Sequence, residues 1–366
     1  MAKSKVYFTD FHTVANENLL AKLERLIRKA GIAAIDFKKQ YAVVKVHFGE
    51  PGNVAYIRPN YGRVVAEVVK SLGGQVFFTD CNTLYVGRRK NALEHIDTAY
   101  ENGYNPFTLG CHVIIGDGLK GTDEEVVKID QQYVKEAKIG RAIMDADIFI
   151  SLNHFKGHVE AGFGGAIKNI GMGCGSRAGK MEMHQDGKPR VKTNLCIGCK
   201  KCFKACASGA ISFAANKKMQ ISDKCTGCGR CIGYCNFNAI ATSWNSPELL
   251  NYKMAEYAYA VLKDRPHFHI SLVCDVSPDC DCFDANDLPI VGDIGMLASF
   301  DPVALDQACA DLVNKAEVTV NSKLGKTKKR SGDHFTDLHP TSNWHSQIEH
   351  AEKIGLGSSN YELIEI

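Results

Sequence analysis

The chain has 366 residues, of which 45% are hydrophobic and 23% charged, with 44 Lys or Arg against 41 Asp or Glu. This balance excludes wholesale disorder, a fibrous repeat and a uniformly basic nucleic-acid binder. The length allows two or three domains. The unusual number is 15 cysteines. The first residues contain no apolar signal segment, and no stretch is apolar enough to span a membrane. We therefore expect a cytoplasmic protein whose cysteines bind metal, catalyse or fill the core, because structural disulfides are rare there.

Strand and helix patterns alternate along the first half of the chain. Strands are expected at residues 5–11, 41–48, 75–81, 111–115 and 147–155, and helices at 18–30, 61–72, 91–102 and 134–146. This alternation predicts an α/β fold with a mostly parallel sheet and flanking helices. Ligands of such sheets lie beyond the carboxyl ends of the strands. Those ends carry His47, Asp80, Cys81, Asp117, Asn153 and His154.

The alternation breaks near residue 190 and resumes after residue 243. The second half predicts helices at 246–263, 301–313 and 345–354, and strands at 267–274, 288–294 and 361–366. We therefore expect an α/β host domain in two parts, 1–189 and 244–366, interrupted by a small α+β ferredoxin-like insert at 190–243. The basic stretch 322–330 is interpreted as a solvated loop, so no nucleic-acid or membrane partner is expected.

The strongest motif is a C-x2-C-x2-C-x3-C run that occurs twice, with an offset of 29 residues at every position. In this pattern three cysteines on a tight loop reach one cubane, and the fourth ligates the other cubane. The spacing predicts two 4Fe–4S clusters, with a pair of zinc knuckles as the alternative. The expected ligands of the first cluster are Cys196, Cys199, Cys202 and Cys235, and those of the second are Cys225, Cys228, Cys231 and Cys206.

A second candidate site lies in the glycine-rich segment 154–180 of the host. His154, Lys156 and His158 alternate, so on an extended chain they project from one face. The two histidines are predicted to act as catalytic acid/base groups or as metal ligands, and Lys156 and Lys168 are predicted to hold a small anionic substrate. The glycines expected to let backbone N–H groups approach a ligand are Gly162, Gly164 and Gly165, the last two opening a short helix with an anion-binding N-terminus. The alternative is a pair of partly exposed loop histidines.

Seven cysteines lie outside the two repeated runs. Cys280 and Cys282 alternate among aspartates, which indicates a possible additional metal site, because nearby negative charge disfavours a thiolate unless a metal offsets it. The alternative is a loop with two inert thiols. Cys174 and Cys274 lie in or near the candidate segments and are further candidates. The other three, Cys81, Cys111 and Cys309, are expected in the core.

Both parts of the chain resemble known families. The insert resembles bacterial two-cluster ferredoxins, although Ala207 and Asn236 stand where a proline usually follows the fourth cysteine. The host is similar to domain-of-unknown-function family 362 in the stretches KVHFGEPGN, IIGDGLKG, HFKGHVEAGFGGAIKNIGMG, CDCF and DIGMLASFDPVALDQA. That resemblance implies a cytosolic iron–sulfur protein of largely anaerobic microbes. A fainter likeness is to lactate-racemase-like nickel-pincer proteins, which also place His and Lys around a glycine-rich segment.

Three functions remain open from the sequence. The first is an iron–sulfur oxidoreductase that receives electrons from a redox partner protein and passes them through the clusters to the host site. The second is a non-redox, metal-dependent isomerase or racemase with structural or sensory clusters. The third is an electron carrier or cluster chaperone without a substrate. The absence of a G-x-S-x-G motif argues against a serine hydrolase.

Overall fold

The protein is described by a computed structural model that covers residues 3–85, 87–184, 188–225, 227–241 and 246–366. Its centre is an eight-stranded sheet, in which β15 runs antiparallel to both neighbours and every other pairing is parallel. The predicted mostly parallel α/β architecture is confirmed. The strand order is β16 (Tyr361–Glu365), β1 (Ser4–Asp10), β15 (Gly295–Ser299), β14 (His267–Val273), β7 (Ile148–His154), β2 (Tyr41–Lys45), β3 (Gln75–Asp80) and β4 (His112–Ile115).

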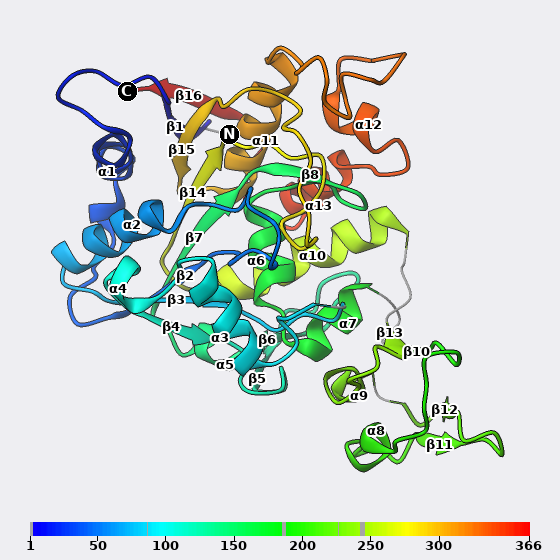
Figure 1. The fold of residues 1–366 in the computed structure, drawn as a ribbon. Coiled ribbons are helices and arrows are strands. Elements are labelled where there is room, and N and C mark those ends of the chain that lie inside the picture. The colour runs from blue at the N-terminus through cyan, green and yellow to red at the C-terminus, as the bar shows by residue number, and fades with distance from the viewer. Residues whose placement is uncertain (1–2, 86, 185–187, 226, 242–245) are drawn as a thin grey trace.

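Helices cover both faces of the sheet (Figure 1). One face packs against α1 (Leu19–Lys29), α2 (Pro59–Ser71), α3 (Ala92–Glu101) and α4 (Pro106–Leu109). The other packs against α6 (Ala166–Cys174), α10 (Pro247–Leu262), α11 (Pro302–Lys315) and α13 (His345–Lys353). Alternation along the strands divides the core, since Val43 faces the second layer and Val44 the first. The central strand β7 is therefore buried along its whole length.

Two predicted elements are wrong. Residues 134–146 form β6 (Glu136–Gly140) and the short helix α5 (Arg141–Met144), and β6 pairs antiparallel with β5 (Glu124–Lys128). The two-residue alternation of buried Ala137 and Ile139 outweighed the helical spacing. No strand forms at 288–294, where Val291 makes only an isolated bridge, because Pro289 and Gly292 disfavour a strand. The strand in this part of the chain is β15, which begins directly after the predicted range.

The remaining elements surround the carboxyl ends of the strands or form the insert. Around the strand ends lie β8 (Lys156–His158), β9 (Gly162–Gly164), α7 (Arg177–His184) and α12 (His334–Leu338), while the 3-10 turn η1 (Ile32–Ala34) follows α1. The insert contains β10 (Arg190–Val191), α8 (Lys201–Lys204), β11 (Ile211–Phe213), β12 (Met219–Ile221), α9 (Arg230–Gly233) and β13 (Ile240–Ala241).

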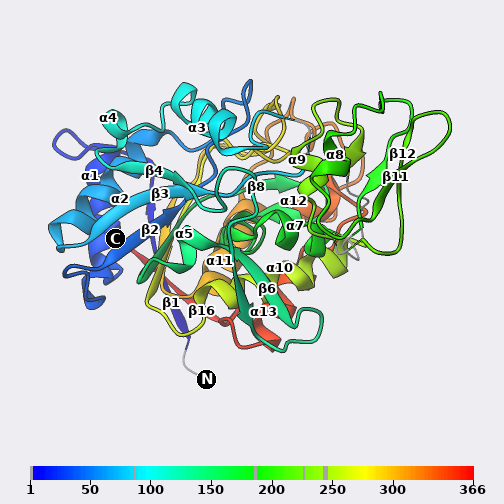
Figure 2. The ribbon, with the colours of Figure 1, turned by 90° about the horizontal axis from the view of Figure 1, so that it is seen from below.

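The insert projects from one end of the host (Figures 1 and 2). Its first and last strands, β10 and β13, pair with each other, so the segment leaves and rejoins the host at one place. Its apolar core contains Leu84 and Met181 of the host, and it packs on α7 through α9. Among the described helices, none combines the length and apolarity needed to cross a membrane.

Candidate functional site

A cavity of about 890 Å³ lies at the carboxyl ends of β2, β3 and β7. This is the edge where ligands of parallel sheets bind, and the polar residues expected there include His47 and Asp80, which line it. Its charged lining is predominantly basic. The basic residues are Lys45, Arg88, Arg89, Lys156, Lys168 and Lys180, and the acidic ones are Glu50, Asp80, Glu160 and Asp284.

One wall of the cavity is a buried ion cluster that the sequence analysis missed apart from Asp80. Lys45 Nζ lies 3.0 Å from the Asp80 carboxylate, and Arg89 bridges Asp80 at 3.1 Å and Glu50 at 2.8 Å. Burial would raise the pKa of Asp80, but the surrounding charges, led by Lys45, outweigh it and lower that pKa. Asn169 of α6 accepts from Lys45 at 2.8 Å and ties the cluster to the glycine-rich segment.

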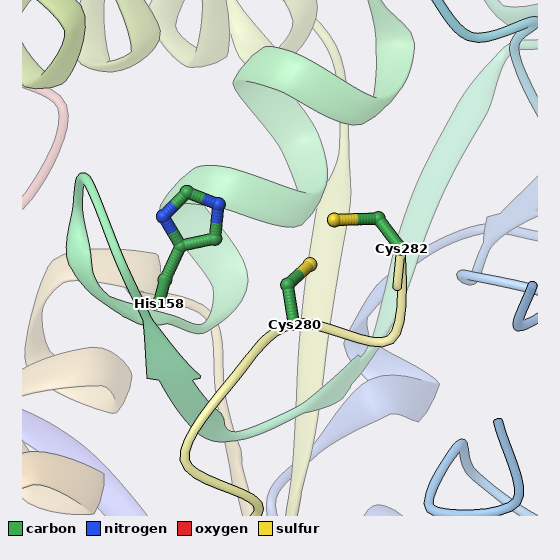
Figure 3. Close-up of side chains that lie close together, drawn as sticks. All are labelled: His158, Cys280 and Cys282. Carbon is green, nitrogen blue, oxygen red and sulfur yellow. The ribbon is translucent and has the colours of Figure 1, made fainter. Parts of the chain in front are cut away.

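A potential metal site lies where His158, Cys280 and Cys282 converge, and two of these residues, His158 and Cys282, line the same cavity (Figure 3). One ligand atom from each lies within 4.8 Å of the others. His158 ends β8, and the two cysteines lie in the loop after β14. The Nδ1 atom of His158 accepts N–H bonds from Glu160 and Ala161 at 3.2 and 2.9 Å, so Nε2 is the nitrogen available to a metal. One imidazole and two thiols form a soft donor set suited to zinc or another transition metal.

Alternation within Cys280–Asp281–Cys282 sorts the three side chains between two environments. The two sulfurs lie beside His158, whereas Asp281 accepts from His154 Nδ1 at 2.9 Å and lies 3.4 Å from Lys156 Nζ. Burial would raise the pKa of Asp281, but the charges of His154 and Lys156 reverse that effect and lower it. Asp281 thus anchors the loop to His154 and Lys156, while Cys282 lines the cavity and the Cys280 sulfur lies near His158.

His154 is therefore not placed as a metal ligand or as an acid/base group facing the cavity, contrary to that expectation. Its Nδ1 is bound to Asp281, and its Nε2 lies 2.9 Å from the carbonyl of Cys274. The side chain is buried and both ring nitrogens have protein partners. His154 ends β7 and His158 ends β8, and of the two only His158 lies close to the cysteine pair.

The two predicted anion-binding lysines both line the cavity. Lys168 Nζ lies 3.5 Å from Cys280 Sγ, and Lys156 Nζ donates to the His154 carbonyl at 3.0 Å. Burial lowers the pKa of His158 well below its usual value, and the nearby charges of Lys168 and Lys156 lower it further. A neutral imidazole is the form that binds metals.

The glycine-rich segment differs from the expectation for an external anion. The N–H groups of Ala166 and Ile167 at the start of α6 donate to the Asp306 carboxylate at 2.6 and 2.9 Å, so a side chain of the protein occupies that helix N-terminus. A Cβ on Gly165 would lie 2.2 Å from Asp306 Oδ1, which explains the glycine. Gly162, with φ of +82°, makes room for Trp344. Only Gly164 lies next to Lys156 and Lys168.

The repeated cysteines lie together in the insert. Cys196, Cys199, Cys202 and Cys235 line one small cavity, which joins the first repeat to the last cysteine of the second. Backbone N–H groups approach two of the predicted ligands, Met219 N at 3.4 Å from Cys196 Sγ and Ala210 N at 3.3 Å from Cys206 Sγ. In the second predicted set, the pKa of Cys231 is raised to about 12 by burial and then by its neighbours Cys228 and Cys225.

The other candidate cysteines lie in the core. Cys174 is the last residue of α6 and is buried in the core layer on that face of the sheet, whereas Cys274 is buried in the core layer on the other face, so neither joins the His158 group. Cys81, Cys111 and Cys309 are buried as expected, and Cys81 also lines the cavity. Glu50, Arg89 and Asn169 were missed because their partners are distant in sequence, for example 39 positions between Glu50 and Arg89.

The fold and site define an α/β protein with a basic pocket at the strand ends, a three-residue metal-binding arrangement and a cysteine-rich insert. The model of the domain of unknown function DUF362 matches residues 42–311. The chain therefore belongs to this family. No curated protein matches the chain.

The solved structures with a distant similarity to this chain include the following two. The lactate racemase apoprotein from Thermoanaerobacterium thermosaccharolyticum is 12% identical with a TM-score of 0.34, over 74% of this chain and 51% of that one. A Thermotoga maritima protein is 12% identical with a TM-score of 0.39, over 81% and 58%. The chain thus spans little more than half the length of either. At that level of similarity, neither protein informs the chemistry of this chain.

Proposed function

We propose that the protein is a cytoplasmic iron–sulfur oxidoreductase that passes single electrons through two 4Fe–4S clusters to the pocket of the host domain. There Lys156 and Lys168 bind a small anionic substrate beside the His158–Cys280–Cys282 group. The cofactors are the two clusters and one further metal ion, and the electrons come from a redox partner protein. None of the 15 cysteines, all of which the structure describes, is joined in a disulfide, which agrees with a reducing compartment.

The observation that carries the proposal is the grouping of cysteines from both repeats. Cys235 belongs to the second run, yet it lines a cavity with Cys196, Cys199 and Cys202 of the first. When two cubanes are ligated in a crossed manner, the last cysteine of each run binds the cluster held by the other run, and the position of Cys235 agrees with this pattern. The sulfurs of a cubane bind four different irons, so they need not converge as tightly as ligands of a single ion. Nearby N–H groups suit the negative charge of ligated sulfur.

Helix α7 provides the contact between the insert and the pocket. On one side, Arg177 and Met181 pack against Gly229 at the start of α9. On the other side, Lys180 lines the pocket. Leu84 belongs both to the apolar core of the insert and to the pocket lining. Helix α7 and Leu84 therefore separate the insert from the pocket, and this short connection supports the proposed electron transfer between them.

The pocket residues have separable tasks. Lys156 and Lys168 hold the charge of the substrate, and Asp281 keeps Lys156 and the cysteine loop in place. Met172, Leu250 and Met254 line the same cavity with apolar surface, which displaces water and strengthens the charge interactions. A metal held by His158, Cys280 and Cys282 would supply Lewis acidity at an open coordination position. Two clusters carrying one electron each together supply the two electrons of an ordinary bond reduction.

The test is anaerobic purification followed by iron and sulfide analysis and EPR spectroscopy of the reduced protein. We expect eight irons and eight sulfides per chain, and far fewer would overturn the proposal. The variants Cys199→Ala and Cys235→Ala should remove the same EPR signal, whereas Cys206→Ala should remove the other. Loss of one signal by Cys199→Ala and of the other by Cys235→Ala would disprove the crossed ligation.

A second function is favoured by the three-ligand site itself, namely a non-redox metal-dependent isomerase or racemase. His158, Cys280 and Cys282 would hold the metal, and the clusters would be structural or sensory. The measurement that distinguishes this function from the first is the rate of substrate conversion while the clusters are kept oxidised. Turnover that persists without reductant, and that depends on one non-iron metal lost in His158→Ala, would favour this function over the first.

A further inference from the structure

The insert is the basic end of an otherwise acidic protein. Residues 190–243 contain nine Lys or Arg and a single acidic residue, Asp223. The rest of the chain holds 35 basic and 40 acidic residues, so the net charge of +3 conceals a strong separation of charge. Such a separation orients an approaching charged molecule over distances of about one Debye length, roughly 10 Å at 0.1 M salt.

The first cysteine run combines exposed apolar side chains with exposed basic ones. Leu195, Ile197 and Phe203 are 40, 61 and 52% exposed, although large apolar side chains usually lie inside. Lys200, Lys201 and Lys204 are exposed beside them in the chain. Among the described residues, these three lysines have no carboxylate partner within ion-pair distance. We call these six residues the basic patch. Protein-docking surfaces combine an apolar centre with a polar rim, and charges across the contact steer partners of opposite charge.

A predicted cluster ligand within the same segment is also exposed. Cys199 is exposed, whereas Cys196 and Cys202 on either side of it are buried. The opposite side of the insert faces the host, because Gly229 and Gly233 of α9 contact Arg177. Figure 1 shows α9 nearer to the host than α8. The first cysteine set is thus the outer one and the second the inner one.

We propose that the basic patch is the docking surface for an acidic one-electron carrier protein, which reduces the outer cluster. This inference rests on the proposed function, since it needs the cluster held by Cys196, Cys199, Cys202 and Cys235. In the transfer step the carrier loses one electron and the outer cluster gains it, with no bond made or broken. Charge complementarity selects the carrier, and the apolar centre excludes water at the contact. Electrons then continue to the inner cluster and to the pocket.

The experiment compares two triple charge reversals in the purified holoprotein. Lys200→Glu, Lys201→Glu and Lys204→Glu are combined in the test variant. Lys328→Glu, Lys329→Glu and Arg330→Glu, in the exposed basic loop of the host, make the same change of net charge in the control. Stopped-flow spectroscopy follows cluster reduction by an acidic flavodoxin, and separately by reduced methyl viologen, which needs no docking surface.

We expect the test variant to be reduced by flavodoxin at least about tenfold more slowly at low ionic strength, and the difference to shrink as salt is added. The control variant should differ much less, and methyl viologen should reduce all three proteins without a comparable loss. Equal slowing of both variants, or a test variant reduced at the original rate, would overturn the docking surface while leaving the clusters intact.

Two further results would also show whether the basic patch docks an electron carrier. If single-stranded RNA binds the protein at physiological salt and the test variant does not, while flavodoxin reduction is unchanged, the basic patch is a nucleic-acid surface and the inference is wrong. If the purified protein lacks iron, the proposed function fails first and the docking of an electron carrier fails with it. The iron content therefore distinguishes a failure of the proposed function from a failure of the docking inference alone.

Discussion

His154 and Asp281 form a buried pair in which Nδ1 of the histidine lies 2.9 Å from the carboxylate. The other ring nitrogen lies 2.9 Å from the carbonyl of Cys274. Both partners are acceptors, so a ring that makes both hydrogen bonds carries a proton on each nitrogen. With Lys156 also 3.4 Å from Asp281, the pair fixes the loop that presents Cys280 and Cys282 to His158.

Replacing Asp281 by Asn should strongly destabilise the protein. The change leaves the buried cations of His154 and Lys156 without a carboxylate, and breaking a buried pair in this way costs about 3 kcal/mol or more. Urea unfolding measures the loss. The control is Asp279→Asn, two residues away, where the partly exposed pair with Lys323 predicts a change below about 1 kcal/mol. Equal effects of the two changes would mean that the buried pair has no special role.

Replacing His158 by Ala should weaken metal binding at the host site. The imidazole is one of three ligands, and even outer-shell partners of metal ligands are worth about 10–100-fold in affinity. Competition with a chelating dye measures zinc affinity, while iron analysis checks that the clusters are unchanged. His112→Ala, at an exposed position of β4, is the control. Unaltered zinc affinity in the His158 variant would show that these three residues do not form the site.

Asp306 should make stability depend on pH between about 4 and 7. Burial raises its pKa from 3.8 to about 7 despite the N–H bonds from Ile167 and Ala166. In that interval the folded protein keeps a proton that the unfolded chain has lost, so Asp306 lowers the free energy of unfolding as pH rises.

The measurement for Asp306 compares Asp306→Asn with the original protein by calorimetry across this pH range. Asn cannot ionise but still accepts an N–H bond, so the variant should gain relative melting temperature as the pH increases. The shift corresponds to a few kcal/mol at most, since each pKa unit is worth about 1.4 kcal/mol. Parallel pH profiles for the two proteins would contradict the assignment.

Arg177 should influence the inner cluster. The side chain is fully buried, and its Nε and Nη1 atoms donate to the carbonyls of Lys120 and Thr83 at 2.9 and 3.1 Å, while Nη2 donates to the Lys90 carbonyl. A buried cation near cluster sulfur favours the reduced, more negative form.

Arg177→Gln should therefore lower the reduction potential of the cluster that Cys206→Ala removes, and Arg177→Lys should restore it in part. Redox titration followed by EPR provides the readout, which a purely structural role would leave unmoved. Arg190→Gln, exposed at the start of the insert, serves as the control. A potential that is the same in Arg177→Gln and in the control would exclude this role.

The sequence by itself determined the alternation of strands and helices, because apolar periodicity reports directly which side of an element is buried. It predicted the parallel sheet and the carboxyl-edge site, and named His158, Lys168, Cys280 and Cys282 before their contacts were known. The error at 134–146 arose because a short amphipathic run satisfies both helical and strand spacing, and only pairing with β5 decides between them.

The tertiary structure decided which of the polar residues contact one another. His154 and His158 are equivalent in sequence spacing, yet Asp281 engages one and the cysteine pair faces the other. The start of α6 has the sequence of an anion site, but Asp306, 140 positions away from Ala166, fills it. Such partners meet only when distant segments pack, since local spacing specifies the direction of a side chain and not what lies opposite it.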